Sequence, residues 1–107
     1  MESRLKRRSA RIVMRLPLYV SPTNAPASAE WEPVETSVIN LHGGMIRSRQ
    51  QFPVGTTLDI RMRNELRFAR GRVVWTAALT KDLAYEVGFE LLDRPGFWEM
   101  NFPEDRW

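Results

Sequence analysis

Apolar residues alternate with other residues in one stretch near the N-terminus, Ile12-Val13-Met14-Arg15-Leu16-Pro17-Leu18-Tyr19-Val20. Every even-numbered residue of this stretch is apolar, so in a β-strand these side chains would share one face. A period of two residues over this length predicts a half-buried strand. Pro17 has no N–H to donate to a neighbouring strand, and it therefore predicts a sheet edge or a bulge at that point.

Similar patterns continue along the chain and predict further strands over residues 34–41, 45–48, 57–63, 66–75 and 84–92. The strand over 66–75 is expected to turn four residues inward, which are Ala69, Gly71, Val73 and Trp75. In the last strand, Tyr85 and Phe89 are expected in the core for the same reason. Six strands separated by turn residues predict an all-β fold, either an antiparallel barrel or a sandwich. The barrel is favoured because closure removes exposed strand edges.

The segments between the strands carry turn and loop signals. Residues 21–33 are rich in Pro, Ser and Ala and predict a loop longer than a hairpin turn. The strongest turn signal is Asn40-Leu41-His42-Gly43-Gly44, because glycine permits a positive φ and close approach of a neighbouring backbone. After residue 92, Pro95 and Gly96 precede a segment rich in aromatic residues. This segment predicts an irregular or single-turn helical cover over one end of the barrel.

The length of 107 residues allows one domain of ordinary size. We expect a flexible basic arm over residues 1–11, a barrel over 12–92 and a C-terminal cover over 93–107. Residues 1–15 carry six basic residues and one acidic residue, which gives +5, and the remaining ten basic and twelve acidic residues give −2. Positive charge is therefore concentrated in the arm, which predicts a local anion site rather than a broad face for duplex nucleic acid.

The residue types that are missing limit the chemistry. The chain has no cysteine, which excludes disulfides, zinc thiolate sites and cysteine nucleophiles. It has one histidine, no cluster with metal-ligand spacing and no phosphate-loop motif, so we expect a binding protein without metal or cofactor rather than an enzyme. No run approaches the roughly 18 apolar residues of a membrane span, and no secretion signal is recognised, so we expect a cytoplasmic location.

Two short motifs resemble those of the PilZ domain, a bacterial receptor for the second messenger cyclic di-GMP. The segment Arg7-Arg8-Ser9-Ala10-Arg11, which runs into the first strand, resembles the family's RxxxR element. The segment Val38-Ile39-Asn40-Leu41-His42-Gly43 occupies the place of its D/NxSxxG element. Residues 71–75 and 87–90 also resemble the late strands of the family. The resemblance implies a six-stranded PilZ-type barrel with cyclic di-GMP as its ligand.

The second motif departs from the family pattern at its first position, where Val38 stands in place of Asp or Asn. In this register Asn40 occupies the serine position and Gly43 the position of the final glycine. In an alternative register Asn40 takes the first position and His42 the serine position, but Gly43 and Gly44 then come at least one residue before the position of the final glycine. The resemblance implies a ligand site made of Arg7, Arg8, Arg11, Val38, Asn40, His42 and Gly43. Arginine can pair with phosphate oxygens or with guanine O6 and N7, whereas Val38 cannot accept the guanine N1–H and N2–H₂ donors.

Three functions are compatible with these residues. The first is a cyclic di-GMP receptor or adaptor with a degenerate second motif, in which Arg7 and Arg11 clamp the ligand. The second is a PilZ-fold adaptor that binds a protein partner and no nucleotide, with Val38 marking a lost site. The third is a small barrel that binds nucleic acid through the arm, and the net negative charge of residues 16–107 disfavours it. Two structural interpretations stand beside them: His42 as a hydrogen-bonding residue of the turn, and the arm as a solubilising tail.

Overall fold

The computed structural model describes residues 11–79, 84–94, 96–100 and 102. Within these residues the chain forms seven strands, which are β1 (Ile12–Val13), β2 (Pro17–Pro22), β3 (Glu32–Asn40), β4 (Gly43–Ser48), β5 (Thr57–Met62), β6 (Phe68–Leu79) and β7 (Ala84–Leu91). The same residues contain no helix. The expected flexible arm lies outside the described residues, except for Arg11.

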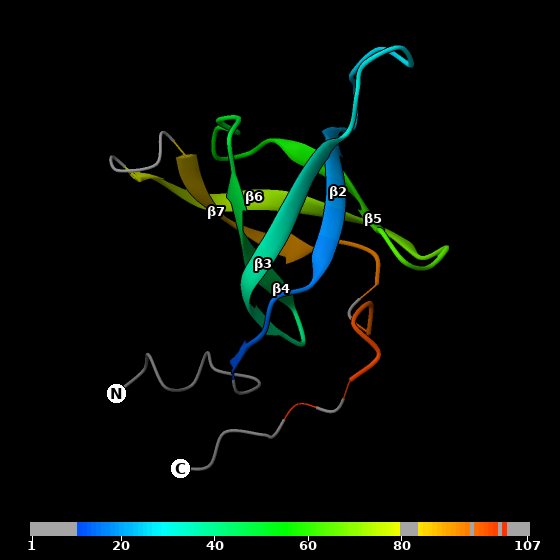
Figure 1. Ribbon diagram of the computed structural model, residues 1–107, viewed down its shortest axis with the longest axis vertical. Helices are drawn as coiled ribbons and strands as arrows, with labels where there is room; N and C mark the ends of the chain where they lie inside the picture. Colours follow the sequence, from blue (N-terminus) through cyan, green and yellow to red (C-terminus); the bar gives the residue numbers. More distant parts are fainter. Residues whose placement is uncertain (1–10, 80–83, 95, 101, 103–107) are drawn as a thin grey trace.

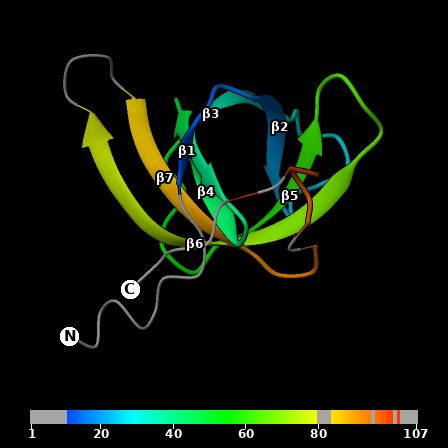
Figure 2. The same ribbon diagram turned by 90° about the horizontal axis from the view of Figure 1, so that it is seen from below.

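Six of the described strands close into an antiparallel barrel (Figures 1 and 2). Their order is β3-β2-β5-β6-β7-β4, and β4 pairs back onto β3 to complete the circle. The short strand β1 also pairs with β3. Figure 2 shows the strands wrapped around a common interior. The predicted six-stranded antiparallel barrel is therefore confirmed, and the sandwich is excluded.

The first predicted strand is interrupted between β1 and β2, and Thr36 of β3 bridges the break. The registers in which β1 and β2 pair with β3 differ by one residue. The Thr36 hydroxyl donates to the Met14 carbonyl oxygen at 2.6 Å and accepts the Leu16 N–H at 2.8 Å. The predicted irregularity therefore lies directly before Pro17, where a buried side chain takes over part of the backbone pairing.

Alternation places one face of β2, β5 and β7 in the interior of the barrel. The side chains of these strands with no exposed surface are Leu18, Val20, Leu58, Ile60 and Val87. Tyr85 is half-buried and packs against this core, as the sequence predicts. After β7, Phe97 and Trp98 are buried in a turn and join the same core. The described residues of the C-terminal segment thus form an irregular cover without a helical turn.

Trp75 is the exception to the predicted core. Val73 of β6 pairs with Phe89, but Trp75 pairs with Gly88, so Val74 is an extra residue that forms a bulge. The bulge reverses the alternation, and the Trp75 side chain is 45% exposed. The prediction that Trp75 is a core residue is therefore wrong, whereas Phe89 is buried as predicted.

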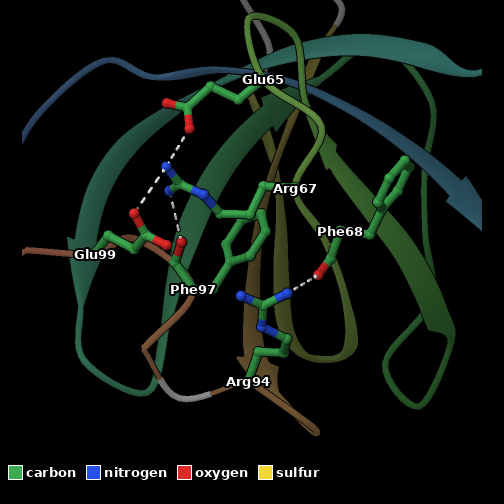
Figure 3. A network of polar contacts seen from close by, with 6 residues as sticks. All are labelled: Glu65, Arg67, Phe68, Arg94, Phe97 and Glu99. Carbon is green, nitrogen blue, oxygen red and sulfur yellow. Dashed lines mark hydrogen bonds and ion pairs between the residues drawn. The ribbon is translucent and has the colours of Figure 1, made fainter.

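Arg67 holds the C-terminal cover against the hairpin between β5 and β6 (Figure 3). Its guanidinium donates to the Phe97 carbonyl oxygen at 2.8 Å and forms ion pairs with Glu65 and, at 3.3 Å, with Glu99. The Arg67 side chain is only 12% exposed, so these charge-assisted bonds are partly shielded from water. The guanidinium of Arg94 adds a hydrogen bond to a backbone carbonyl of β6 at 3.3 Å. The cover is therefore joined to the barrel by polar contacts as well as by its buried aromatic rings.

Candidate ligand-binding site

Two neighbouring rows of residues cross the outer face of β3, β4, β7 and β6, and one of them begins on β1. Residues paired across antiparallel strands project to the same face, so the strand pairing fixes the members of each row. The first row is apolar and contains Val13, Val38, Met45, Gly88 and Trp75. The second row is mostly polar and contains Asn40, Gly43, Glu90 and Arg72. We call the surface formed by these two rows the trough.

The pairing also shows why the trough lies outside the barrel. Ile39 and Phe89, which alternate with the members of the rows along β3 and β7, are buried in the core. The rows must therefore face the opposite way. Arg11 extends the polar row, because the next residue, Ile12, pairs with Ile39 and so brings Arg11 beside Asn40.

Glycine occupies the middle of both rows and leaves the trough open there. A Cβ atom on Gly43 would lie 2.0 Å from the Phe89 carbonyl oxygen, so β4 and β7 can approach this closely only around glycine. Neither Gly43 nor Gly44 has a positive φ, and Gly55 is the one described glycine that does. Of the two properties that a glycine pair permits, the close backbone approach is therefore present here and the positive φ is not.

The trough contains a cavity of about 440 Å³ that gathers the predicted site residues from both motifs. Its lining includes Arg11, Val38, Asn40, His42 and Gly43. Arg11 comes from the first motif, and the other four come from the second. Arg7 and Arg8 lie outside the described residues, so their place relative to the cavity stays a prediction.

Hydrogen bonds hold the turn between β3 and β4 in one conformation. The Asn40 Oδ1 atom accepts the His42 N–H at 2.9 Å. The Trp98 indole N–H donates to the carbonyl oxygens of Asn40 at 2.9 Å and of Gly43 at 3.2 Å. The Leu91 N–H donates to the His42 carbonyl oxygen at 2.7 Å. The turn is therefore ordered by the fold itself, and the exposed His42 side chain remains accessible to a ligand.

Trp75 and Glu90 are among the residues that line the cavity and lie outside both motifs. Sequence alternation misplaces Trp75 because the bulge at Val74 is set by pairing with β7. One signal was present in the run of apolar residues 73–75, since a period of two cannot place three successive residues on one face. Nothing local connects Glu90 with the second motif; the pairing of β4 with β7 brings it opposite Gly43.

The fold is a closed antiparallel β-barrel of six strands, and a cavity opens on its outer wall. Residues 5–96 match the PilZ domain, and the chain belongs to this family. The match includes both motifs and confirms the resemblance seen in the sequence. PilZ domains are in general cyclic di-GMP-binding modules. No curated protein matches the chain.

Two further properties of the described residues bear on function. They include no helix with the length and hydrophobicity that crossing a membrane requires. They also include no group of three or more His, Asp or Glu side chains placed to hold a metal ion. The cytoplasmic location and the absence of a cofactor stay predictions from the sequence.

Proposed function

We propose that this PilZ domain is a receptor for cyclic di-GMP and that the ligand binds in the trough. The observation that carries the proposal is the meeting of the two motifs: Arg11 of the first and four residues of the second line one cavity of about 440 Å³. Small-molecule sites commonly have volumes of about 300–1,000 Å³, and this cavity falls in that range. The trough is on the outer wall, so a flat dinucleotide can enter it without opening the barrel.

The polar row suits the phosphate groups of the ligand. The exposed Arg11 guanidinium can pair with two phosphate oxygens or with guanine O6 and N7. Arg7 and Arg8 precede Arg11 by four and three residues, and four residues of extended chain span up to about 14 Å. All three arginines can therefore reach one ligand. We expect Arg7 and Arg11 to clamp the dinucleotide and Arg8 to add positive charge.

The apolar row suits the bases. The Trp75 indole is 45% exposed, and a base stacked on an aromatic side chain contributes about 1–3 kcal/mol of binding free energy. Gly88 pairs with Trp75 across the strands, and even a single Cβ atom at that position would lie 3.5 Å from the Trp75 Cβ atom. The absence of a side chain on Gly88 therefore leaves room for a base beside the indole.

Val38 weakens the site relative to an intact second motif. An Asp or Asn at this position would offer an acceptor to the guanine N1–H and N2–H₂ groups, and valine offers none. A hydrogen bond to a charged acceptor contributes about 1.5–3 kcal/mol, which corresponds to about one to two decades in affinity. We therefore expect binding to persist with reduced affinity.

Isothermal titration calorimetry with cyclic di-GMP tests the proposal. We expect binding by the wild type, at least about a 10-fold weaker affinity for Arg11→Ala, and a larger loss when Arg7→Ala is added. Arg15→Ala is the matched control, because Arg15 is exposed, lies four residues further along the chain and does not line the cavity. Absence of binding heat from folded wild type at high micromolar ligand would contradict the proposal.

A protein–protein adaptor without a nucleotide ligand is the second candidate, and Val38 is the observation that favours it. The apolar row exposes Val13 and Trp75, which are suited to contact with a protein surface. A pull-down whose bound partner is unaffected by cyclic di-GMP and by Arg7→Ala with Arg11→Ala would support the adaptor. A bound partner that depends on cyclic di-GMP or on these two arginines would support the receptor.

A further inference from the structure

Glu90 gives the trough a carboxylate that the second motif lacks. It is the only acidic residue among the described residues that line the cavity. It lies on β7 in the polar row, where it pairs across the strands with Gly43 on one side and Arg72 on the other. Neither motif contains Glu90, so the motifs assign it no role.

Arg72 orients this carboxylate and leaves one of its oxygens open. The Nε and Nη2 atoms of Arg72 donate to Glu90 Oε2 at 3.0 Å and 2.5 Å. Both bonds end on Oε2, so Oε1 receives no hydrogen bond from the part of the chain that the structure describes. The Glu90 side chain is 42% exposed and lines the cavity, so a ligand can reach it from outside. A carboxylate oxygen held in this way is an acceptor for a donor on a ligand.

The cavity leaves space for a ligand group beside Glu90, because Asn40, Gly43 and Glu90 all line it. Asn40 and Glu90 flank Gly43 in the polar row, and no side chain stands between them. A base can therefore enter between them with one edge toward Glu90, beside the row that contains Trp75.

We propose that Glu90 is a specificity-determining residue that accepts a hydrogen bond from the N1–H or N2–H₂ group of a guanine, in the role that Val38 cannot fill. Arg72 is the positioning residue that holds Glu90. This assignment rests on the proposed function, since it requires a cyclic dinucleotide in the trough. Guanine carries donors at N1 and N2, whereas adenine has none at these two positions. A fixed carboxylate therefore selects a guanine-containing ligand over its adenine counterpart.

Titrations of wild type and Glu90→Gln with cyclic di-GMP and cyclic di-AMP test the assignment. The substitution removes the charge and keeps the size of the side chain. We expect Glu90→Gln to bind cyclic di-GMP about 10- to 100-fold more weakly and to bind cyclic di-AMP no more weakly than the wild type does. Glu86→Gln is the matched control, because Glu86 lies on the same strand, four residues away on the same face, and does not line the cavity.

Two further variants separate the specificity role from a structural one. Glu90→Asp keeps the charge on a shorter side chain, and its affinity for cyclic di-GMP is expected between those of the wild type and Glu90→Gln. Arg72→Met leaves the carboxylate without its positioning partner, and we expect a smaller loss of affinity together with reduced selectivity for guanine. Thermal unfolding of each variant verifies that the barrel is intact.

Each outcome decides the assignment. Equal cyclic di-GMP affinity of wild type and Glu90→Gln would overturn the role of Glu90 and leave the proposed function standing. If Glu90→Gln weakens the binding of both dinucleotides equally, the Arg72–Glu90 ion pair is a structural contact, and the assignment is also overturned. Failure of the folded wild type to bind cyclic di-GMP would overturn the proposed function and this assignment with it.

Discussion

Arg11 of the first motif and the residues of the second motif meet at one trough, but the fold holds them in different ways. The second motif ends in a turn whose backbone carbonyl oxygens accept hydrogen bonds from Trp98 and Leu91. Gly43 in this turn is also in close contact with β7. The first motif ends at Arg11, an exposed residue next to a strand of only two residues. Within the described residues, one side of the site is therefore set by folding, and the other depends on the exposed side chain of Arg11. Substitutions in the turn should change stability first, and substitutions of the arginines should change affinity alone.

Gly43→Ala should have the largest effect on the turn. The added Cβ atom would lie 2.0 Å from the Phe89 carbonyl oxygen, so β4 and β7 would have to separate. We expect the free energy of unfolding to fall by about 3 kcal/mol or more, measured by urea denaturation. Gly96→Ala is the control, because a Cβ atom there meets nothing within 4 Å. Similar stabilities of the two variants would show that the close approach is not required.

Trp98→Phe should have the next largest effect. Phenylalanine keeps an aromatic ring in the core but cannot donate to the Asn40 and Gly43 carbonyl oxygens. We expect a loss of about 2 kcal/mol in urea denaturation and faster amide exchange in the turn, because its carbonyl groups lose a shared donor. Trp75→Phe is the matched control, since Trp75 is half-exposed and outside the core. Equal destabilisation by both changes would contradict a specific role of the indole N–H.

Val38→Asp should strengthen ligand binding. The change supplies the acceptor that the second motif lacks, and we expect about a 10-fold gain in cyclic di-GMP affinity by calorimetry, which is about 1.4 kcal/mol. Val13→Asp is the control, because Val13 is the cross-strand neighbour of Val38 in the same row and is 85% exposed. An equal gain from Val13→Asp would show that added negative charge, and not the position of the acceptor, caused the change.

Arg11→Ala should have the smallest effect on stability. Arg11 is exposed and precedes the first described strand, so we expect the free energy of unfolding to change by less than about 0.5 kcal/mol while cyclic di-GMP affinity falls. Urea denaturation of this variant beside Gly43→Ala compares the two sides of the site directly. Strong destabilisation by Arg11→Ala would mean that the first motif is also part of the folded framework.

Local sequence patterns predict most of the fold because the period of a strand is a local property. Alternation correctly places Leu18, Val20 and Phe89 in the core, and the removal of exposed strand edges correctly favours the barrel. The motifs predict that Arg11 and the turn meet at one site. The strand predictions depend only on residues close together in the sequence. The shared site is implied by the family resemblance, and the pairing of β1 with β3 brings the two segments together.

The features of the fold and of the candidate site that the sequence patterns miss depend on pairing between residues far apart in the chain. The bulge at Val74 turns Trp75 outward only because β6 pairs with β7 in that register. The glycine pair suggests positive φ, but Gly43 is required by the approach of β7. The bonds from Trp98 to the turn join residues 55 and 58 positions apart. Glu90 enters the candidate site in the same way, through the pairing of β7 with β4.

The central claim is that cyclic di-GMP binds in the trough on the outer face of β3, β4, β7 and β6. The most direct test is a titration of ¹⁵N-labelled protein with cyclic di-GMP, followed by heteronuclear NMR. We predict that the largest shifts will fall on the amides of residues 38–44 and 88–90 and on the Trp75 indole N–H. The amide chemical shifts of residues in β2 and β5 around the contact of Arg61 with Tyr19 should remain unchanged. Shifts confined to β2 and β5, or no shifts at high micromolar ligand, would contradict the claim.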